Sequence, residues 1–170
     1  MSTWLFGYGS LVWRPDFPFL NARDGYVVGW TRRFWQGSHD HRGVPGAPGR
    51  VVTLVREPEA ICWGRAYEIE ASVWEQVARG LDHREKDGYV RHRERVCFED
   101  GDEVEASVYV ATPDNPSFLG DAPFEALVAQ IRSAAGPSGS NVDYVLELSR
   151  ALRAMGAADP HVDAIAEALS

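Results

Sequence analysis

Near its start the chain reads WLFGYGSLVW, from Trp4 to Trp13. Its first three residues predict a short buried strand, because an apolar run that ends in a turn signal is typical of one. The glycines that follow permit positive φ and let a ligand approach bare backbone N–H groups, as in an anion-binding nest. A bulge or tight turn has the same signature. The run is neither a dinucleotide-binding loop, whose third glycine is replaced by Val12, nor a P-loop, since no Gly-Lys-Ser/Thr follows.

Further strands are expected in the first two thirds of the chain. The segments are rich in β-branched and aromatic residues, and residues 89–98 alternate between apolar and charged positions. The run GVPGAPG, residues 43–49, indicates a loop between two of them. The expected strands cover residues 26–34, 50–55, 61–69, 89–98 and 104–111.

Helices are expected mainly later in the chain. Ser72 to Glu75 has the form of a capping box, Ser140 or Asn141 is suited to cap a later helix, and Asp159-Pro160 opens the last one. The apolar positions are Val73, Val77 and Leu81, then Phe124, Leu127, Val128 and Ile131 after Pro123, then Val142, Val145, Leu146 and Leu152. Strands first and helices later, without a βαβ rhythm, predict an α+β fold, a small mixed or antiparallel β-barrel with flanking helices.

Length and composition bound the class of protein. The 170 residues suit one domain, residues 1–170, and 45% hydrophobic with 25% charged residues excludes a disordered chain. No apolar run reaches the roughly 18 residues of a membrane-spanning helix, and the start lacks the basic segment of a signal peptide. Cys62 and Cys97 are too far apart for a C-x-x-C metal or redox site. We therefore expect a soluble, cytoplasmic protein with no membrane partner.

The charge is unevenly distributed along the chain. The net charge is −8, with +4 on residues 1–56 and −10 on residues 97–170. An acidic protein is unsuited to nonspecific nucleic-acid binding, which needs a basic face. The N-terminal excess of arginine can serve a small anionic ligand or be a solvated surface of mixed sign.

Three other patterns bear on chemistry. His39-Asp40-His41 with His83 offers imidazoles, but no H-E-x-x-H or cysteine partner supports a metal site, so none is expected. Ser10 lacks the G-x-S-x-G environment of a serine hydrolase. The charged run of residues 81–89 is typical of a solvated turn, unless the chain folds over it, in which case a glutamate held among apolar groups has a raised pKa.

A series of motifs runs in order through the chain. They are residues 6–13 (FGYGSLVW), 32–38 (RRFWQGS), 40–46 (DHRGVPG), 48–54 (PGRVVTL), 84–86 (REK) with Gly88 and Tyr89, 114–116 (DNP), and 135–139 (AGPSG) with Asn141 and Tyr144. Together they resemble the γ-glutamylcyclotransferase superfamily and, within it, the ChaC branch of glutathione-specific enzymes. The resemblance covers nearly the whole chain. The Tyr-Gly-Ser-Leu motif is shared across the superfamily, whereas the DHRGVPG and REK motifs together are highly specific.

The resemblance implies a lyase that converts glutathione to 5-oxoproline and cysteinylglycine on a small β-barrel. By motif position Glu85 matches the catalytic acid/base, and the γ-glutamyl-binding loop is matched by Gly7, Tyr8, Gly9, Ser10, Leu11 and Val12. Tyr144 is expected to reach the site from a helix. His83 stands where the family usually has an aromatic residue and Asp87 where it usually has glycine, so a second carboxylate near Glu85 either raises its pKa or faces water.

The chemistry implied is an internal transamidation, which requires no cofactor, metal or water. The α-amino group attacks the γ-carbonyl of the same molecule, and a well-oriented internal reaction of this kind is strongly favoured. One carboxylate can move the proton between two nitrogens bonded to the same carbon, and Glu85 is the candidate. The N–H groups of Gly9, Ser10 and Leu11 can stabilise the oxyanion. Arg33 or Arg42 can pair with the glycyl carboxylate, or be surface residues.

Other functions remain open at this point. The same chemistry on other γ-glutamyl amines or amino acids is the nearest alternative, and the Asp40–Gly46 motif speaks against it. A catalytically inactive binding module would be marked by loss of Glu85, which is present. The expected partner is the small molecule glutathione, with no nucleic acid, in a monomer or weak dimer.

Overall fold

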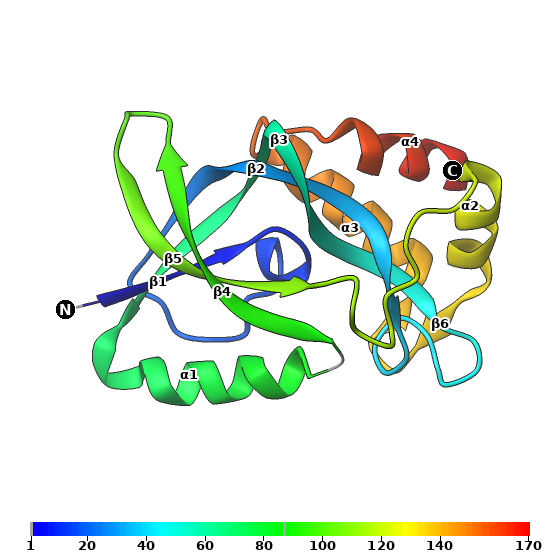
Figure 1. The fold of residues 1–170 in the computed structure, drawn as a ribbon, viewed down its shortest axis with the longest axis horizontal. Coiled ribbons are helices and arrows are strands. Elements are labelled where there is room, and N and C mark those ends of the chain that lie inside the picture. Colours follow the sequence, from blue (N-terminus) through cyan, green and yellow to red (C-terminus); the bar gives the residue numbers. More distant parts are fainter. Residues whose placement is uncertain (1, 87) are drawn as a thin grey trace.

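The strands of the protein form a barrel that closes where its first and last strands meet. The structure is a computed structural model that describes residues 2–86 and 88–170. Within these residues the barrel order is β1-β3-β2-β4-β5 (Figure 1). The closing contact is parallel and pairs Trp4 with Ala106 and Leu5 with Ser107. The strands are β1 (Ser2–Gly7), β2 (Asn21–Ser38), β3 (Gly49–Glu70), β4 (Tyr89–Phe98) and β5 (Glu103–Ala111). The expected mixed β-barrel is confirmed.

The two longest strands, β2 and β3, form one antiparallel hairpin that spans the barrel. Their pairing runs from Asn21 opposite Glu68 to Ser38 opposite Gly49. The expected break between strands at 50–55 and 61–69 is therefore wrong. The Glu-Pro-Glu-Ala segment, residues 57–60, bulges instead of turning, since the register jumps from Val28–Ile61 to Trp30–Arg56 and Glu59 adopts a φ of 68°.

The helices pack on two sides of the barrel. Helix α1 (Ala71–Arg84) lies along one side, whereas α2 (Phe124–Ser133), α3 (Asn141–Ala154) and α4 (Pro160–Leu169) gather on the other (Figure 1). A short 3-10 turn, η1 (Ser10–Val12), follows β1, and a small hairpin of β6 (Ala135–Gly136) and β7 (Gly139–Ser140), not anticipated from the sequence, precedes α3. Among the described helices, none has the length and apolar character needed to cross a membrane.

Polar caps explain where two of the helices begin. Ser140 accepts a hydrogen bond from the Asp143 N–H at 3.0 Å, and Asp159 accepts one from the His161 N–H at 3.0 Å, as predicted. The expected capping box at Ser72 is wrong. Strand β3 runs directly into α1, so Ser72 lies inside the first turn and donates to the Glu70 carboxylate instead.

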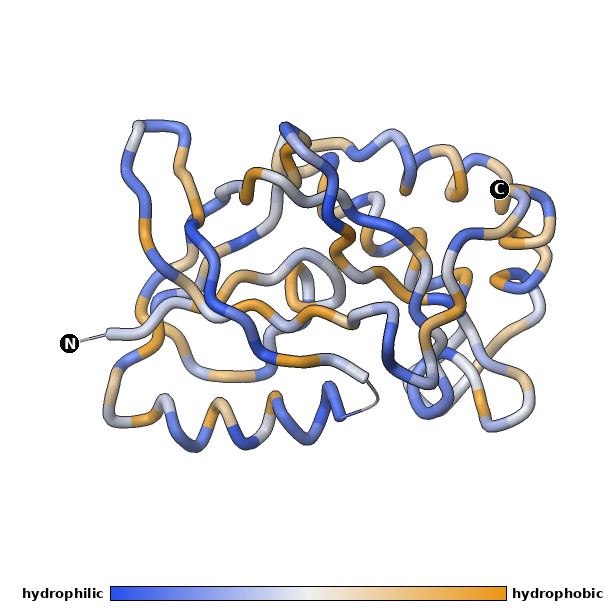
Figure 2. The backbone as a smooth tube through the Cα atoms, in the orientation of Figure 1, coloured by the Kyte–Doolittle hydropathy of each residue, from blue (hydrophilic) through white to orange (hydrophobic). Residues whose placement is uncertain are grey.

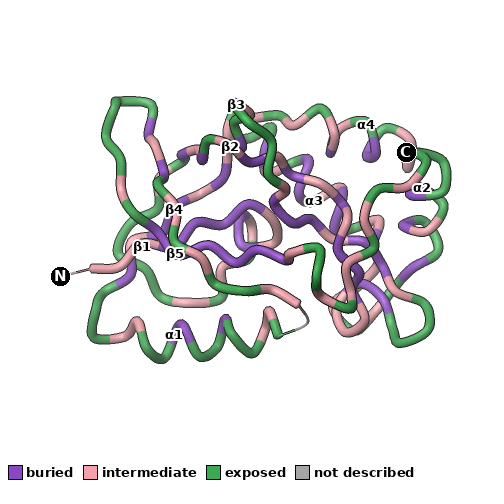
Figure 3. The backbone as a smooth tube through the Cα atoms, in the orientation of Figure 1, coloured by how far each residue is buried: buried purple, intermediate pink, exposed green. Residues whose placement is uncertain are grey.

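Apolar side chains fill the barrel and the layer between it and α2–α4. Figure 2 shows many hydrophobic residues along the central strands, and Figure 3 shows buried residues along the same strands. Phe6, Phe34, Val108 and Leu148 are at most 1% exposed. A smaller cluster joins Leu5, Tyr67, Ile69 and Tyr109 to Val77 and Leu81 of α1.

The core also contains a charged side chain, Arg32 of β2, which is 1% exposed. Its Nη1 pairs with Asp159 Oδ2 at 2.7 Å, and its Nε donates to the Tyr8 carbonyl at 2.7 Å. Its Nη2 donates to the Trp63 carbonyl. The guanidinium thus joins β2 and β3 to the segment after β1 and to the cap of α4.

We predict that Arg32→Met destabilises the protein by about 3–5 kcal/mol, because it leaves the Asp159 carboxylate half-buried without its partner. Urea unfolding measures the loss. Arg93→Met is the matched control, since its ion pair with Glu105 is 63% exposed on both sides and contributes at most about 1 kcal/mol. An equal loss of unfolding free energy in the two variants would show that the buried ion pair stabilises the protein no more than the exposed one.

Candidate active site

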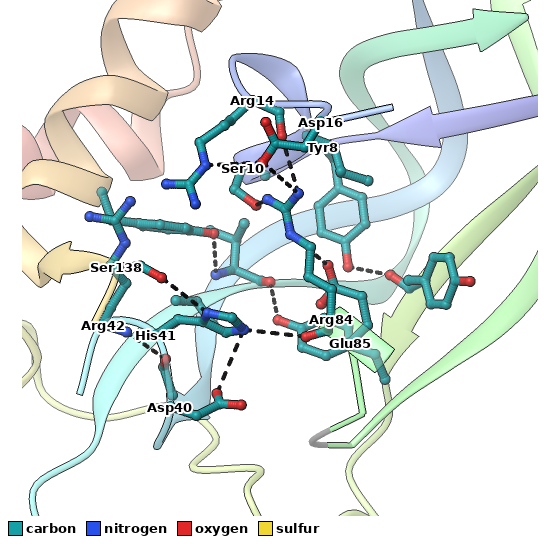
Figure 4. A pocket seen from close by; sticks show the side chains of 18 of the residues that line it. Tyr8, Ser10, Arg14, Asp16, Asp40, His41, Arg42, Arg84, Glu85 and Ser138 are labelled. Carbon is teal, nitrogen blue, oxygen red and sulfur yellow. Dashed lines mark hydrogen bonds and ion pairs between the residues drawn. The ribbon is translucent and has the colours of Figure 1, made fainter. Parts of the chain in front are cut away.

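A pocket lies where the segment after β1, the end of α1, the loop after β2 and the start of α3 meet (Figure 4). Six of the residues expected at the site line it: Tyr8, Gly9, Ser10, Leu11, Glu85 and Tyr144. Gly7 and Val12 do not. Gly7 ends β1, where an added Cβ would lie 2.6 Å from the Leu11 Cβ, and Val12 is 1% exposed in the core. These two residues support the loop from behind.

Glu85 follows the last residue of α1 and faces the pocket. Its N–H donates to the Leu81 carbonyl at 2.8 Å, which fixes the backbone, and its side chain is 18% exposed. Burial raises the pKa of Glu85 to about 7, the nearby Arg84 guanidinium lowers it and the Asp40 carboxylate raises it. The carboxyl group therefore exchanges its proton near neutral pH. Asp87, the second carboxylate expected near Glu85, lies outside the described residues.

Arg84 links Glu85 to the segment Tyr8–Leu11 after β1, called the glycine loop below. Its Nη2 donates to the Ser10 Oγ at 2.7 Å, its Nη1 donates to the Arg14 carbonyl at 3.2 Å, and its Nε lies 4.0 Å from Glu85 Oε1. One side chain thus holds the loop beside the carboxyl group. The REK motif marked this position in the sequence, but it carried no indication of the contact with Ser10.

The loop itself approaches its neighbours closely. A Cβ on Gly9 would lie 3.0 Å from Val52 Cγ2 and 3.1 Å from the Tyr144 hydroxyl. The carbonyls of Gly9 and Ser10 accept hydrogen bonds from Val12 and Arg14. Among the described residues, the N–H groups of Gly9, Ser10 and Leu11 donate to no protein acceptor. These three donors are available to a ligand.

Tyrosines form much of the pocket wall. Tyr8 donates to the Tyr109 carbonyl at 2.5 Å, Tyr89 donates to the Val52 carbonyl at 2.8 Å, and Tyr144 accepts from the Val52 N–H at 3.2 Å. Burial raises the pKa of Tyr8 and Tyr89, and it raises that of Tyr144 to about 12. All three therefore stay neutral near neutral pH. Tyr109 was missed as a site residue, since in the sequence it is one apolar position of a strand.

The histidines are separated in the structure. His41 lines the pocket, where its Nδ1 lies 3.1 Å from Ser138 Oγ and its Nε2 lies 3.3 Å from the Arg84 carbonyl. His83 is exposed on α1. In the described part of the chain, no three His, Cys, Asp or Glu side chains are grouped as metal ligands would be.

The arginines considered for an anionic ligand differ in position. Arg42 lines the pocket and is 6% exposed. Arg33 lies elsewhere, in a second hollow beside Trp35 and His161, and its Nη1 donates to the Arg32 carbonyl. Of the two candidates, the structure brings only Arg42 to the site.

Comparison with known proteins places these features in a family. A family model described as ChaC-like protein matches residues 3–170. The chain is 43% identical to glutathione-specific γ-glutamylcyclotransferase 1 of Danio rerio, over 99% of this chain and 89% of that protein. It is 43% identical to the Homo sapiens protein of the same name, over 98% of this chain and 78% of that protein. A crystal structure of a yeast γ-glutamylcyclotransferase specific to glutathione superposes with a TM-score of 0.92 at 28% identity, over 99% and 95% of the two chains. The chain belongs to the ChaC family.

Proposed function

We propose that the protein is a glutathione-specific γ-glutamylcyclotransferase, a lyase that converts glutathione to 5-oxoproline and cysteinylglycine. The observation that carries this proposal is the buried Glu85, with a pKa of about 7, beside a glycine loop whose N–H donors have no acceptor among the described residues. The relatives named as glutathione-specific support glutathione over other γ-glutamyl amines.

The reaction needs one carboxyl group that both accepts and donates a proton. Ionised Glu85 accepts a proton from the α-ammonium, and the freed amine attacks the γ-carbonyl carbon to form a five-membered ring. The protonated carboxyl then delivers this proton to the cysteinyl nitrogen as its bond to that carbon breaks. The regenerated carboxylate passes the surplus proton of the ring nitrogen to the released amine, which leaves as an ammonium group. Atoms and charge balance without water, because the two products together contain every atom of glutathione.

The raised pKa suits this exchange. An ordinary glutamate, with a pKa of about 4.3, is a weak base for an ammonium group, whereas a pKa near the working pH serves both proton transfers. The main cause is burial of the carboxyl group, which disfavours the ionised form.

The glycine loop can stabilise the charge that develops on the γ-carbonyl oxygen. Fixed N–H donors are effective for this purpose because they require no reorganisation during the reaction. Gly9, Ser10 and Leu11 supply such donors, and Arg84 fixes the loop through its contact with Ser10. In this proposal Tyr8 and Tyr144 pack around the γ-glutamyl chain.

Glu85→Gln tests the role of the carboxyl group. The amide cannot exchange a proton, so turnover of reduced glutathione is expected to fall by about 10²–10⁴-fold while binding and the melting temperature are kept. Mass spectrometry of 5-oxoproline measures turnover, with γ-glutamyl-alanine as a second substrate. Glu99→Gln, at an exposed turn, is the control. Retained activity in Glu85→Gln would remove Glu85 from the mechanism, and equal wild-type turnover of both substrates would widen the proposed specificity.

The pH dependence of kcat/KM provides a second test. Activity is expected to rise with pH through about 7 as Glu85 loses its proton. Because the Asp40 carboxylate raises this pKa and the Arg84 guanidinium lowers it, Asp40→Asn should shift the rise to lower pH and Arg84→Gln to higher pH. Shifts in the same direction, or none, would show that another group controls the profile.

We also propose that the protein acts in the cytoplasm as a monomer or weak dimer. Cys62 and Cys97 are free thiols, the usual state in a reducing compartment. Sedimentation velocity at micromolar concentration should give a single species of monomer mass, or a concentration-dependent shift to a dimer. A tight oligomer would contradict the prediction.

A further inference from the structure

Arg42 is a buried cation in the pocket wall, and most of its N–H donors make no hydrogen bond to the described residues. A guanidinium has five N–H donors. The structure gives one hydrogen bond to this one, from Nη1 to the Ser140 carbonyl at 3.1 Å. Among the described residues, no carboxylate forms an ion pair with it within 4.0 Å, and those of Glu147 and Asp143 act on it only at longer range. Leaving such a charge buried without a close counterion is costly, so the arrangement is suited to an anion that arrives with the ligand.

The other arginines near the site are already engaged. Arg14 pairs with Asp16 at 3.3 Å, and Arg84 bonds to Ser10 and lies 4.0 Å from Glu85. Arg50, which is also buried without a carboxylate, donates to the Gln130 side chain and to two carbonyls. Of these four arginines, only Arg42 is buried, lines the pocket and keeps N–H donors that bond to no described residue.

The surroundings hold the Arg42 side chain in position. The guanidinium carbon lies 5.6 Å from the centroid of the Tyr144 ring. The start of β7 passes so close that a Cβ on Gly139 would lie 3.0 Å from Nη1. Gly139 also has a φ of 121°, which other residues rarely adopt. The cation is therefore built into the pocket rather than left mobile at its rim.

Arg42 and Glu85 lie on opposite sides of the pocket, with Ser138 beside Arg42 and His41 between them (Figure 4). With the γ-carbonyl of glutathione at Glu85, the end of the molecule most distant from the reacting atoms is the glycyl carboxylate. An extended Cys-Gly segment spans about 7 Å, whereas γ-glutamyl-alanine ends one residue, about 3.5 Å, earlier.

We propose that Arg42 binds the glycyl carboxylate of glutathione and thereby selects glutathione over γ-glutamyl amines that lack this group. The inference rests on the proposed function and adds the determinant of its specificity. A planar guanidinium makes paired, charge-assisted hydrogen bonds to a carboxylate, which lysine cannot reproduce.

The test compares glutathione with its glycyl monoethyl ester, which carries the same reacting groups but no glycyl charge. Wild-type protein should have a higher kcat/KM for glutathione than for the ester. Arg42→Gln should lower kcat/KM for glutathione by about 10- to 100-fold, chiefly through KM, and leave that for the ester nearly unchanged. The kcat/KM of Arg42→Lys for glutathione should lie between the values of the wild-type protein and of Arg42→Gln. Arg33→Gln, outside the pocket, is the control and should keep the wild-type preference.

Each outcome bears on the proposal. An equal loss on both substrates would assign Arg42 a structural role or another contact, and equal wild-type use of the ester would exclude recognition of the glycyl carboxylate. Melting temperatures identify a variant that fails to fold, in which case Arg42→Lys and the wild-type comparison still decide. Absence of 5-oxoproline from wild-type protein with either substrate would instead overturn the proposed function itself.

Discussion

The guanidinium of Arg32 bonds to three parts of the chain that are far apart in sequence: the carbonyls of Tyr8 and Trp63 and the carboxylate of Asp159. The Tyr8 carbonyl belongs to the first residue of the glycine loop, so the position of the loop depends on a charge buried in the barrel. Asp159 serves at once as the counterion of Arg32 and the cap of α4. The helical layer and the site are therefore held to the barrel by the same ion pair.

Glu85 and Arg42 are two buried ionisable groups of one pocket, and the proposed function uses each differently. Burial brings the pKa of Glu85 near neutrality, so that its charge can appear and disappear during a reaction. Burial also lowers the pKa of Arg42, yet a guanidinium stays charged at any pH of interest. Its charge is therefore stabilised by a bound anion and not by loss of a proton. In the proposed function, a pocket lined in part by neutral phenols thus holds one group for proton transfer and one for charge recognition.

Local patterns predicted those elements whose signals are local. The bounds of β4 agree with the alternating segment, and Ser140 and Asp159 cap their helices as expected. The bulge at residues 57–60 was misjudged because proline and acidic residues indicate a turn, whereas pairing with β2 keeps the strand continuous. Arg32 and Arg33 are neighbours in the sequence, but the Arg32 side chain lies in the core and the Arg33 side chain does not. The burial of Glu85 depends on contacts between α1, the glycine loop and the segment around Asp40, which no spacing in the sequence reveals.

The parallel seam between β1 and β5 is short, and it joins residues about 100 positions apart. The β2–β3 hairpin, by contrast, closes a loop of only ten residues. Since the entropy of loop closure grows with loop length, the hairpin can form before the seam does. The glycine loop follows directly from β1, so a chain that has its hairpin but not its seam lacks an assembled pocket. Catalytic competence during refolding should accordingly return with the slowest step of barrel formation, after most of the secondary structure is in place.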